Sequence, residues 1–170
     1  MLSLINQKNM KKYCQHVILF CLLLSLSSCG FRLRGSADLA FQTIFVQGST
    51  LTISNNLSKS LATNGVQVVK SAENADLLLE MIGEESEKRI LSLAGSGTVN
   101  EFELYYRVHY RTKRAGDALW GPTQTVEARR DFTYSDANLL AKQGEEKRLN
   151  ENMQADVLSG IMRRLSSFKK

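Results

Sequence analysis

Proline and cysteine are scarce in this chain, which has one Pro and three Cys among its 170 residues. A single proline excludes a proline-rich linker, and an apolar content of 43% excludes wholesale disorder. No apolar run reaches the roughly 18–20 uncharged residues of a membrane-spanning helix, which excludes a polytopic membrane protein. The length suits one domain of ordinary size that is large enough to bury a core.

The apolar stretch over 17–26, near the N-terminus, is typical of a secretory signal. Lysines are the only charges before it, and its length falls within the roughly 7–15 residues of a signal's central region. The sequence therefore predicts a signal peptide over 1–28, for which Met10 is an alternative start. An uncleaved anchor is the other interpretation, but the stretch is too short to span a bilayer.

The tetrapeptide Leu26-Ser27-Ser28-Cys29 ends this stretch and resembles the lipobox of bacterial lipoproteins. The resemblance implies cleavage before Cys29, a diacylglycerol on its thiol and an acyl chain on its new amine, with no other cofactor. The same resemblance implies the outer membrane, because inner-membrane lipoproteins usually carry Asp where this chain has Gly30. The folded part, residues 29–170, would form a single domain that faces the periplasm.

Removal of the signal changes the composition of the mature chain. Cys14 and Cys21 leave with it, so the mature chain has no partner for an internal disulfide even in an oxidising compartment. Three lysines leave as well, so the excess of 22 basic over 17 acidic residues nearly disappears. The mature chain therefore lacks the large positive charge that would favour nucleic-acid binding, and no nucleic-acid partner is expected.

The mature segment opens with Cys29-Gly30-Phe31-Arg32-Leu33-Arg34, which resembles the start of the LPS-assembly lipoproteins, the LptE family. Further agreement comes from 61–66, from Glu101-Phe102 and from Leu140-Ala141-Lys142, in the family's order and spacing. The resemblance implies a non-enzymatic lipoprotein that plugs and helps to assemble the LptD barrel, lies in its lumen, and binds lipopolysaccharide during insertion into the outer leaflet. A periplasmic scaffold or envelope-linked lipoprotein with a similar small sandwich is the alternative.

The apolar pattern predicts the first elements independently of this resemblance. Short strands over 43–46 and 66–69 flank a helix over 53–64, with Ser54 as a possible cap and Gly65 as its stop. Strand, helix and strand in so few residues favour a parallel crossover.

The remaining elements are longer. A third strand begins at 77–82 and runs on, bent, towards Leu93, and a turn follows at 95–97. Two strands over 101–111 and 125–134 then alternate between an apolar and a charged face, as an antiparallel hairpin does when its sheet is covered on one side only.

A last helix, with Asp136 as its N-cap, carries an apolar stripe that repeats every four residues from Leu149 to Leu165. Together the elements predict an α+β fold, a two-layer sandwich of a mixed four- to five-stranded sheet with two helices packed on one face.

Catalysis finds little support in the sequence. The mature chain has one histidine, His109, placed in mid-strand among charged neighbours, and a nucleophile–base set would need it. A metal site would need several converging His, Cys or carboxylate ligands, and the thiol of Cys29 would be acylated. We therefore expect neither an enzyme nor a metal site.

Lipopolysaccharide carries phosphates and carboxylates, so its site requires fixed cations. By the resemblance, Lys142 matches the family's basic residue at the start of the last helix. The family also places cations near the turn after the third strand, where 95–97 offers none. The substitutes considered are Lys88, Arg89, Arg129 and Arg130. Ordinary surface charges are the alternative for all of them.

Trp120, in a loop beside Gly121-Pro122, is the candidate contact with the barrel, because tryptophan anchors often dominate interfaces. The alternative is that it only covers the end of the sheet.

Overall fold

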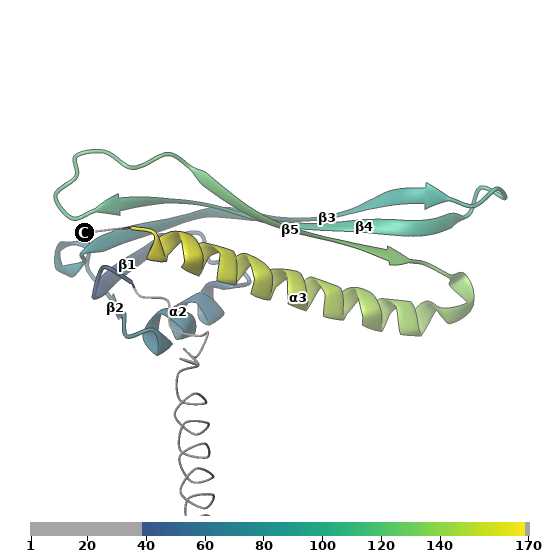
Figure 1. Cartoon of the computed structure of the whole chain (residues 1–170), viewed down its shortest axis with the longest axis horizontal. Helices are drawn as coiled ribbons and strands as arrows, with labels where there is room; N and C mark the ends of the chain where they lie inside the picture. The colour runs from purple at the N-terminus through teal and green to yellow at the C-terminus, as the bar shows by residue number, and fades with distance from the viewer. Residues whose placement is uncertain (1–38, 169–170) are drawn as a thin grey trace, which may run out of the picture. The chain divides into compact units, whose positions relative to one another are not determined.

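The computed structural model describes residues 39–168, which lie within the unit Ser36–Lys170. These residues form one open five-stranded sheet and two α-helices (Figure 1). In chain order the elements are β1 (Thr43–Gly48), α2 (Ser54–Thr63), β2 (Gln67–Val69), β3 (Leu77–Leu93), β4 (Val99–Arg114), β5 (Gln124–Thr133) and α3 (Leu139–Ser166). The strand order is β2-β1-β3-β4-β5, and the predicted α+β fold with a mixed sheet is confirmed. The predicted signal peptide and Cys29 lie outside the described residues.

The first crossover follows the sequence pattern. β1 pairs in parallel with both β2 and β3. α2 follows β1 in the chain, precedes β2, and buries the side chains of Leu57 and Leu61 in the core. Gly65 ends α2 with φ +79, a conformation that glycine adopts without steric cost. Ser54 does not cap the helix as predicted. It is the first helical residue, and its hydroxyl accepts a hydrogen bond from the Leu51 N–H at 2.8 Å.

β3 is the strand that joins the two halves of the sheet. Its first residues pair with β1, and its whole length pairs antiparallel with β4, with a register shift between Met81 and Gly83. Leu77 and Leu79 face the helices before this shift, whereas Lys88 faces the helices after it, opposite Leu104. The strand continues to Leu93, as the sequence pattern predicted, and the shift reverses which residues of β3 face the core.

α3 covers the same face of the sheet as α2 (Figure 1). Its buried residues include Met153, Val157, Ile161 and Leu165, as the four-residue stripe predicted. It begins at Leu139, after a 3-10 turn over Asp136–Asn138, so the prediction of Asp136 as the N-cap was wrong. We call the covered side of the sheet the helix face and the other side the open face.

Candidate functional site

The five candidate cations divide between the two faces of the sheet. The helix face has Lys88, Arg130 and Lys142, and the open face has Arg89 and Arg129. Neighbouring residues of a strand point to opposite faces, so each of the predicted pairs on β3 and β5 is split. Lys88 and Lys142 both lie beside the first turns of α3, where their partners Glu146 and Glu145 are adjacent in sequence.

Lys142 lies in the first turn of α3, close to the end of β5. Its ammonium donates hydrogen bonds to Glu145 Oε2 at 2.8 Å and to the Thr133 hydroxyl at 3.2 Å. The side chain is 19% exposed. An ammonium has three N–H donors, so these two bonds leave one donor for a ligand.

Lys88 reaches across from β3 to α3. Its Nζ lies 2.6 Å from Glu146 Oε2 and 4.2 Å from the centroid of the Phe102 ring. Phe132 and Tyr134 complete the aromatic cluster, with ring centroids 5.4 and 6.0 Å from the same nitrogen. Cation–π attraction and the ion pair both hold this lysine over the cluster.

Arg130 has a different role on the helix face. Its guanidinium pairs with Asp156 of α3 and donates to the Arg129 carbonyl at 2.7 Å. Both contacts fasten β5 to α3, away from the first turn of that helix. The partner of Arg130 on α3 is therefore Asp156, whereas the partners of Lys88 and Lys142 are Glu146 and Glu145, nearer the start of the helix.

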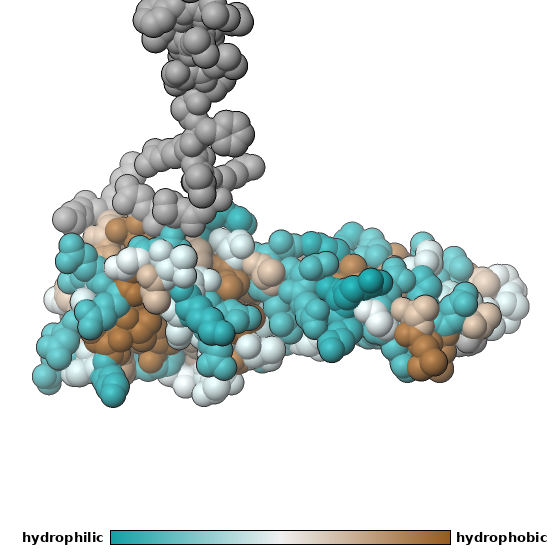
Figure 2. Space-filling view, turned by 90° about the horizontal axis from the view of Figure 1, so that it is seen from below, coloured by the Kyte–Doolittle hydropathy of each residue, from teal (hydrophilic) through white to brown (hydrophobic). Residues whose placement is uncertain are grey.

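A group of exposed apolar side chains, not predicted from the sequence, lies at the same end of the sheet, and we call it the distal patch. It consists of Ile90, Leu91, Leu93, Leu139 and Leu140, which are 58, 46, 58, 45 and 84% exposed. The β3–β4 turn and the start of α3 meet at this end (Figure 1), and the helix side of the molecule shows a hydrophobic patch there (Figure 2). The available signal in β3 was the adjacent apolar pair 90–91, since neighbours in a strand cannot both face the core. In α3 it was the pair 139–140, which precedes the apolar stripe that starts at Leu149.

The open face is covered by a ladder of ion pairs. Arg89 donates two hydrogen bonds to Glu87, at 2.5 and 2.7 Å, and Arg129 lies 2.9 Å from Glu103. The centroid of the Tyr105 ring lies 4.8 Å from the Arg89 guanidinium and 4.6 Å from that of Arg107. Both candidate cations of this face are thus engaged by carboxylates.

The charges of this ladder shift its pKa values in the expected directions. The hydrogen bond from Arg89 lowers the pKa of the Glu87 carboxyl, and the hydrogen bond to Glu103 raises the pKa of the Tyr105 hydroxyl. Among the described strands, the open face carries more carboxylates than cations. The carboxylates are Glu80, Glu85, Glu87, Glu101, Glu103, Glu127 and Asp131, and the cations are Arg89, Arg107, Arg111, Lys113 and Arg129.

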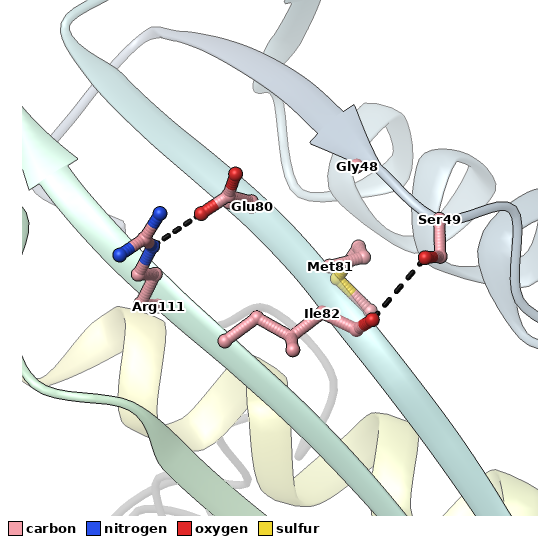
Figure 3. A pocket seen from close by; sticks show the side chains of 6 residues that line it. All are labelled: Gly48, Ser49, Glu80, Met81, Ile82 and Arg111. Carbon is pink, nitrogen blue, oxygen red and sulfur yellow. Dashed lines mark hydrogen bonds and ion pairs between the residues drawn. The ribbon is translucent and has the colours of Figure 1, made fainter.

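Trp120 lies at the other end of the open face. It is half-buried, and the Arg111 guanidinium lies 5.0 Å from its ring. Arg111 also donates to Glu80, which lowers the pKa of that carboxyl. Arg111, Glu80 and Ile82 line a shallow pocket of about 480 Å³ where β1 ends (Figure 3).

The described residues do not assemble a metal site. None of their His, Cys, Asp and Glu side chains form a group of three or more that could hold a metal ion. His109 contacts the Thr125 hydroxyl at 2.8 Å and Glu85 at 3.4 Å, as a member of the open-face ladder. Within 39–168, no helix combines the length and the hydropathy that crossing a membrane requires.

Comparison with known proteins identifies the family. The chain resembles the solution structure of the uncharacterized lipoprotein B from Nitrosomonas europaea, with 37% identity and a TM-score of 0.71 over 82% of this chain and 92% of that one. It also resembles the crystal structure of the rare lipoprotein B from Shewanella oneidensis, with 25% identity and a TM-score of 0.66 over 74% and 94% of the two chains. A minor lipoprotein from Acinetobacter baumannii shares the fold at 20% identity, with a TM-score of 0.62 over 76% and 93% of the two chains.

A search of curated proteins found no significant match. The family model described as "LptE: Lipopolysaccharide-assembly" matches residues 41–165. This range contains the two α-helices and five strands described above, apart from the last residue of α3. The chain therefore belongs to the LptE family of lipopolysaccharide-assembly proteins.

Proposed function

We propose that this chain is an outer-membrane lipoprotein, anchored through lipid on Cys29, that plugs and helps to assemble the LptD barrel and binds lipopolysaccharide on its way to the outer leaflet. The family match and the lipoprotein neighbours support the role in lipopolysaccharide assembly. The role is non-enzymatic: the protein holds and orients a lipid and a partner, and no step makes or breaks a covalent bond.

The observation that carries the lipopolysaccharide part is the combination of cations and exposed apolar side chains at one end of the sheet. Lipid A is an amphiphile with phosphates on a sugar headgroup and several acyl chains. Lys142 and Lys88 would face the phosphates, and the leucines of the distal patch would contact the chains. An exposed apolar patch of this kind marks an interaction site.

The geometry at Lys142 adds to this support. It lies in the first turn of α3, where backbone N–H groups and the helix dipole attract an anion. A bound phosphate would take the free donor of the Lys142 ammonium and compete with Glu145 for the others. Binding should therefore weaken as salt rises, because this side chain is partly open to solvent.

The test is lipopolysaccharide binding by the purified full-length protein. Lys142→Glu reverses the charge at the site, whereas Lys147→Glu makes the same change on an exposed lysine of the same helix. We expect Lys142→Glu to weaken lipopolysaccharide binding about tenfold at low salt, because a charge-assisted hydrogen bond contributes about 1.5–3 kcal/mol. Lys147→Glu should change the affinity by less than about threefold. Equal binding by the wild type and Lys142→Glu would contradict the assignment of this site.

A further inference from the structure

The loop between β4 and β5 presents an apolar side chain on a fixed support. It rises from the open face, on the side of the sheet opposite α2 and α3 (Figure 1). The Gly121 N–H donates to the Thr112 carbonyl at 2.9 Å, and the Lys113 ammonium donates to the Ala118 carbonyl at 3.2 Å. Between these two ties Leu119 is 81% exposed. An isolated exposed leucine is ordinary on a protein surface, so the residues around it decide whether the loop is a site.

The neighbours of Leu119 have the composition of a membrane–water interface. The half-buried Trp120 has its ring centroid 5.0 Å from the Arg111 guanidinium, and Arg111 lines a pocket with Ile82, which is 42% exposed (Figure 3). We call Arg111, Lys113, Leu119 and Trp120 the loop corner. At a membrane surface a tryptophan ring lies among the headgroups, aliphatic side chains lie below it, and long basic side chains reach the phosphates.

Charge divides along the open face. Six of its seven carboxylates, all except Glu80, lie on the distal side of the register shift between Met81 and Gly83. Glu80 is paired with Arg111. Lys113 lies opposite Leu78, and among the described residues no carboxylate forms an ion pair with it. The acidic part of the open face therefore begins beyond the loop corner.

The whole end of the molecule around the loop corner has more cations than carboxylates. The Phe168 ring lies 5.6 Å from the Arg114 guanidinium, so the last turn of α3 is at this end too. Within 76–82, 111–121 and that last turn the cations are Arg111, Lys113, Arg114, Arg163 and Arg164, and the carboxylates are Asp76, Glu80 and Asp117. This excess attracts an anionic lipid surface and repels a basic protein.

The chain that leads from the lipid anchor enters the fold at the same end. The N–H groups of Gln42 and Thr43 donate to the Asp76 carboxylate, each at 2.9 Å, and the Asp76 carbonyl accepts from Ala115, at the base of the loop, at 3.0 Å. Ten residues separate Cys29 from position 39, and they span at most about 33–36 Å. An anchor on Cys29 therefore keeps the loop end within reach of the lipid surface, whereas the far end of the 17-residue β3 lies about 55 Å away.

We propose that the loop corner docks on the anionic phospholipid surface in which Cys29 is anchored. Leu119 and the Trp120 ring enter the headgroup layer, and Arg111 and Lys113 reach the lipid phosphates. The inference rests on the proposed function through the lipid on Cys29. The acyl chains hold the protein to the membrane, and the loop corner determines which end of the fold faces the phospholipid. The distal patch, at the other end of the sheet, then faces away from it.

The first experiment uses the fluorescence of Trp120, which reports on the loop corner alone because the chain has one tryptophan. The mature lipoprotein is reconstituted in vesicles of phosphatidylcholine and phosphatidylglycerol whose acyl chains carry bromine, which quenches tryptophan on contact. We expect brominated lipid to lower the emission at least about twofold at low salt, because the basic side chains hold the loop at the anionic surface. Quenching should be much weaker in phosphatidylcholine alone and at high salt.

Two matched pairs of variants locate the contact. Leu119→Ser and Leu140→Ser make the same change at side chains that are 81 and 84% exposed, at opposite ends of the sheet. Lys113→Gln and Lys147→Gln each remove one positive charge, and a glutamine at 113 retains an N–H donor for the Ala118 carbonyl. Leu119→Ser and Lys113→Gln should each lower the ratio of docked to undocked protein about fivefold. The variants at 140 and 147 should quench as the wild type does.

Flotation of the same vesicles separates this inference from the proposed function. Protein that floats with the vesicles but is not quenched, or equal quenching of Leu119→Ser and the wild type, would overturn the inference and leave the lipid anchor standing. A loss of quenching in Leu140→Ser would place the contact at the distal patch and overturn it as well. Protein that does not float would contradict the anchor and therefore both proposals.

The second experiment identifies the neighbour of the loop in cells. A photo-reactive amino acid at position 119 of the full-length lipoprotein should cross-link to phospholipid. A cross-link to a protein or to lipopolysaccharide instead would overturn the inference.

Discussion

Two glycines of α3 allow the packing of this helix on the sheet to be measured with one chemical change. At Gly160 an added Cβ would lie 2.6 Å from Val126 Cγ1, whereas at Gly144 nothing lies within 4 Å. Carbon atoms pack best at about 3.5–4.0 Å, so Gly160→Ala must move the helix or the β5 strand by about 1 Å. The valine cannot turn away easily, because a β-branched side chain is stiff at χ1.

The expected magnitudes follow from two opposing terms. Replacing a glycine by alanine inside a helix stabilises it by about 0.8–1 kcal/mol, and this term is the same for both variants. Overpacking in a filled core costs about 1–3 kcal/mol, and this term applies only at Gly160. Gly144→Ala should therefore raise the free energy of unfolding by about 1 kcal/mol, and Gly160→Ala should lie about 1–3 kcal/mol below Gly144→Ala.

The assay is urea unfolding of the unit 36–170, followed by circular dichroism of the helices, for both variants and for the double variant with Val126→Ala. Removing the valine methyl groups should make Gly160→Ala stabilising by about 1 kcal/mol in that background, which gives a clear coupling energy in the double-mutant cycle. Equal effects of Gly160→Ala and Gly144→Ala would show that α3 does not approach β5 as closely as described, and an absence of coupling to Val126→Ala would show the same.

Two further predictions concern the anchor and one half-buried acid, Glu84. Cys29→Ser should abolish fatty-acid labelling and leave the precursor uncut on a gel; a labelled, processed variant would contradict the lipid anchor. Burial raises the pKa of Glu84, but hydrogen bonds from Thr52 and Tyr106 outweigh this and hold the pKa below its ordinary value of 4.5. The stability from these bonds is therefore present above pH 4.5 and lost as the pH falls through the lower pKa of the folded state. Glu84→Gln should cost about 1–2 kcal/mol at pH 7 and much less at pH 3, measured by urea unfolding; an equal cost at both pH values would contradict this.

The sequence alone determined the type and order of the elements. The period-2 alternation of β4 and β5, the four-residue stripe of α3 and the stop at Gly65 are local patterns, and all three were confirmed. The parallel crossover and the mixed sheet followed from them, because short connections restrict the possible topologies. The motif residues at Cys29 also came from the sequence, and their lipid anchor stays a prediction.

The tertiary structure alone decided what the candidate site residues do. Lys88 and Arg89 were predicted together, yet the register shift in β3 and the alternation of the strand send Lys88 to the helix face and Arg89 to the ladder on the open face. Partners from other elements, such as Glu146 on α3, then fix each cation in place. No local pattern contains this information, since one extra residue in a strand reverses the facing of every side chain after it, and only pairing with β4 shows where that residue is.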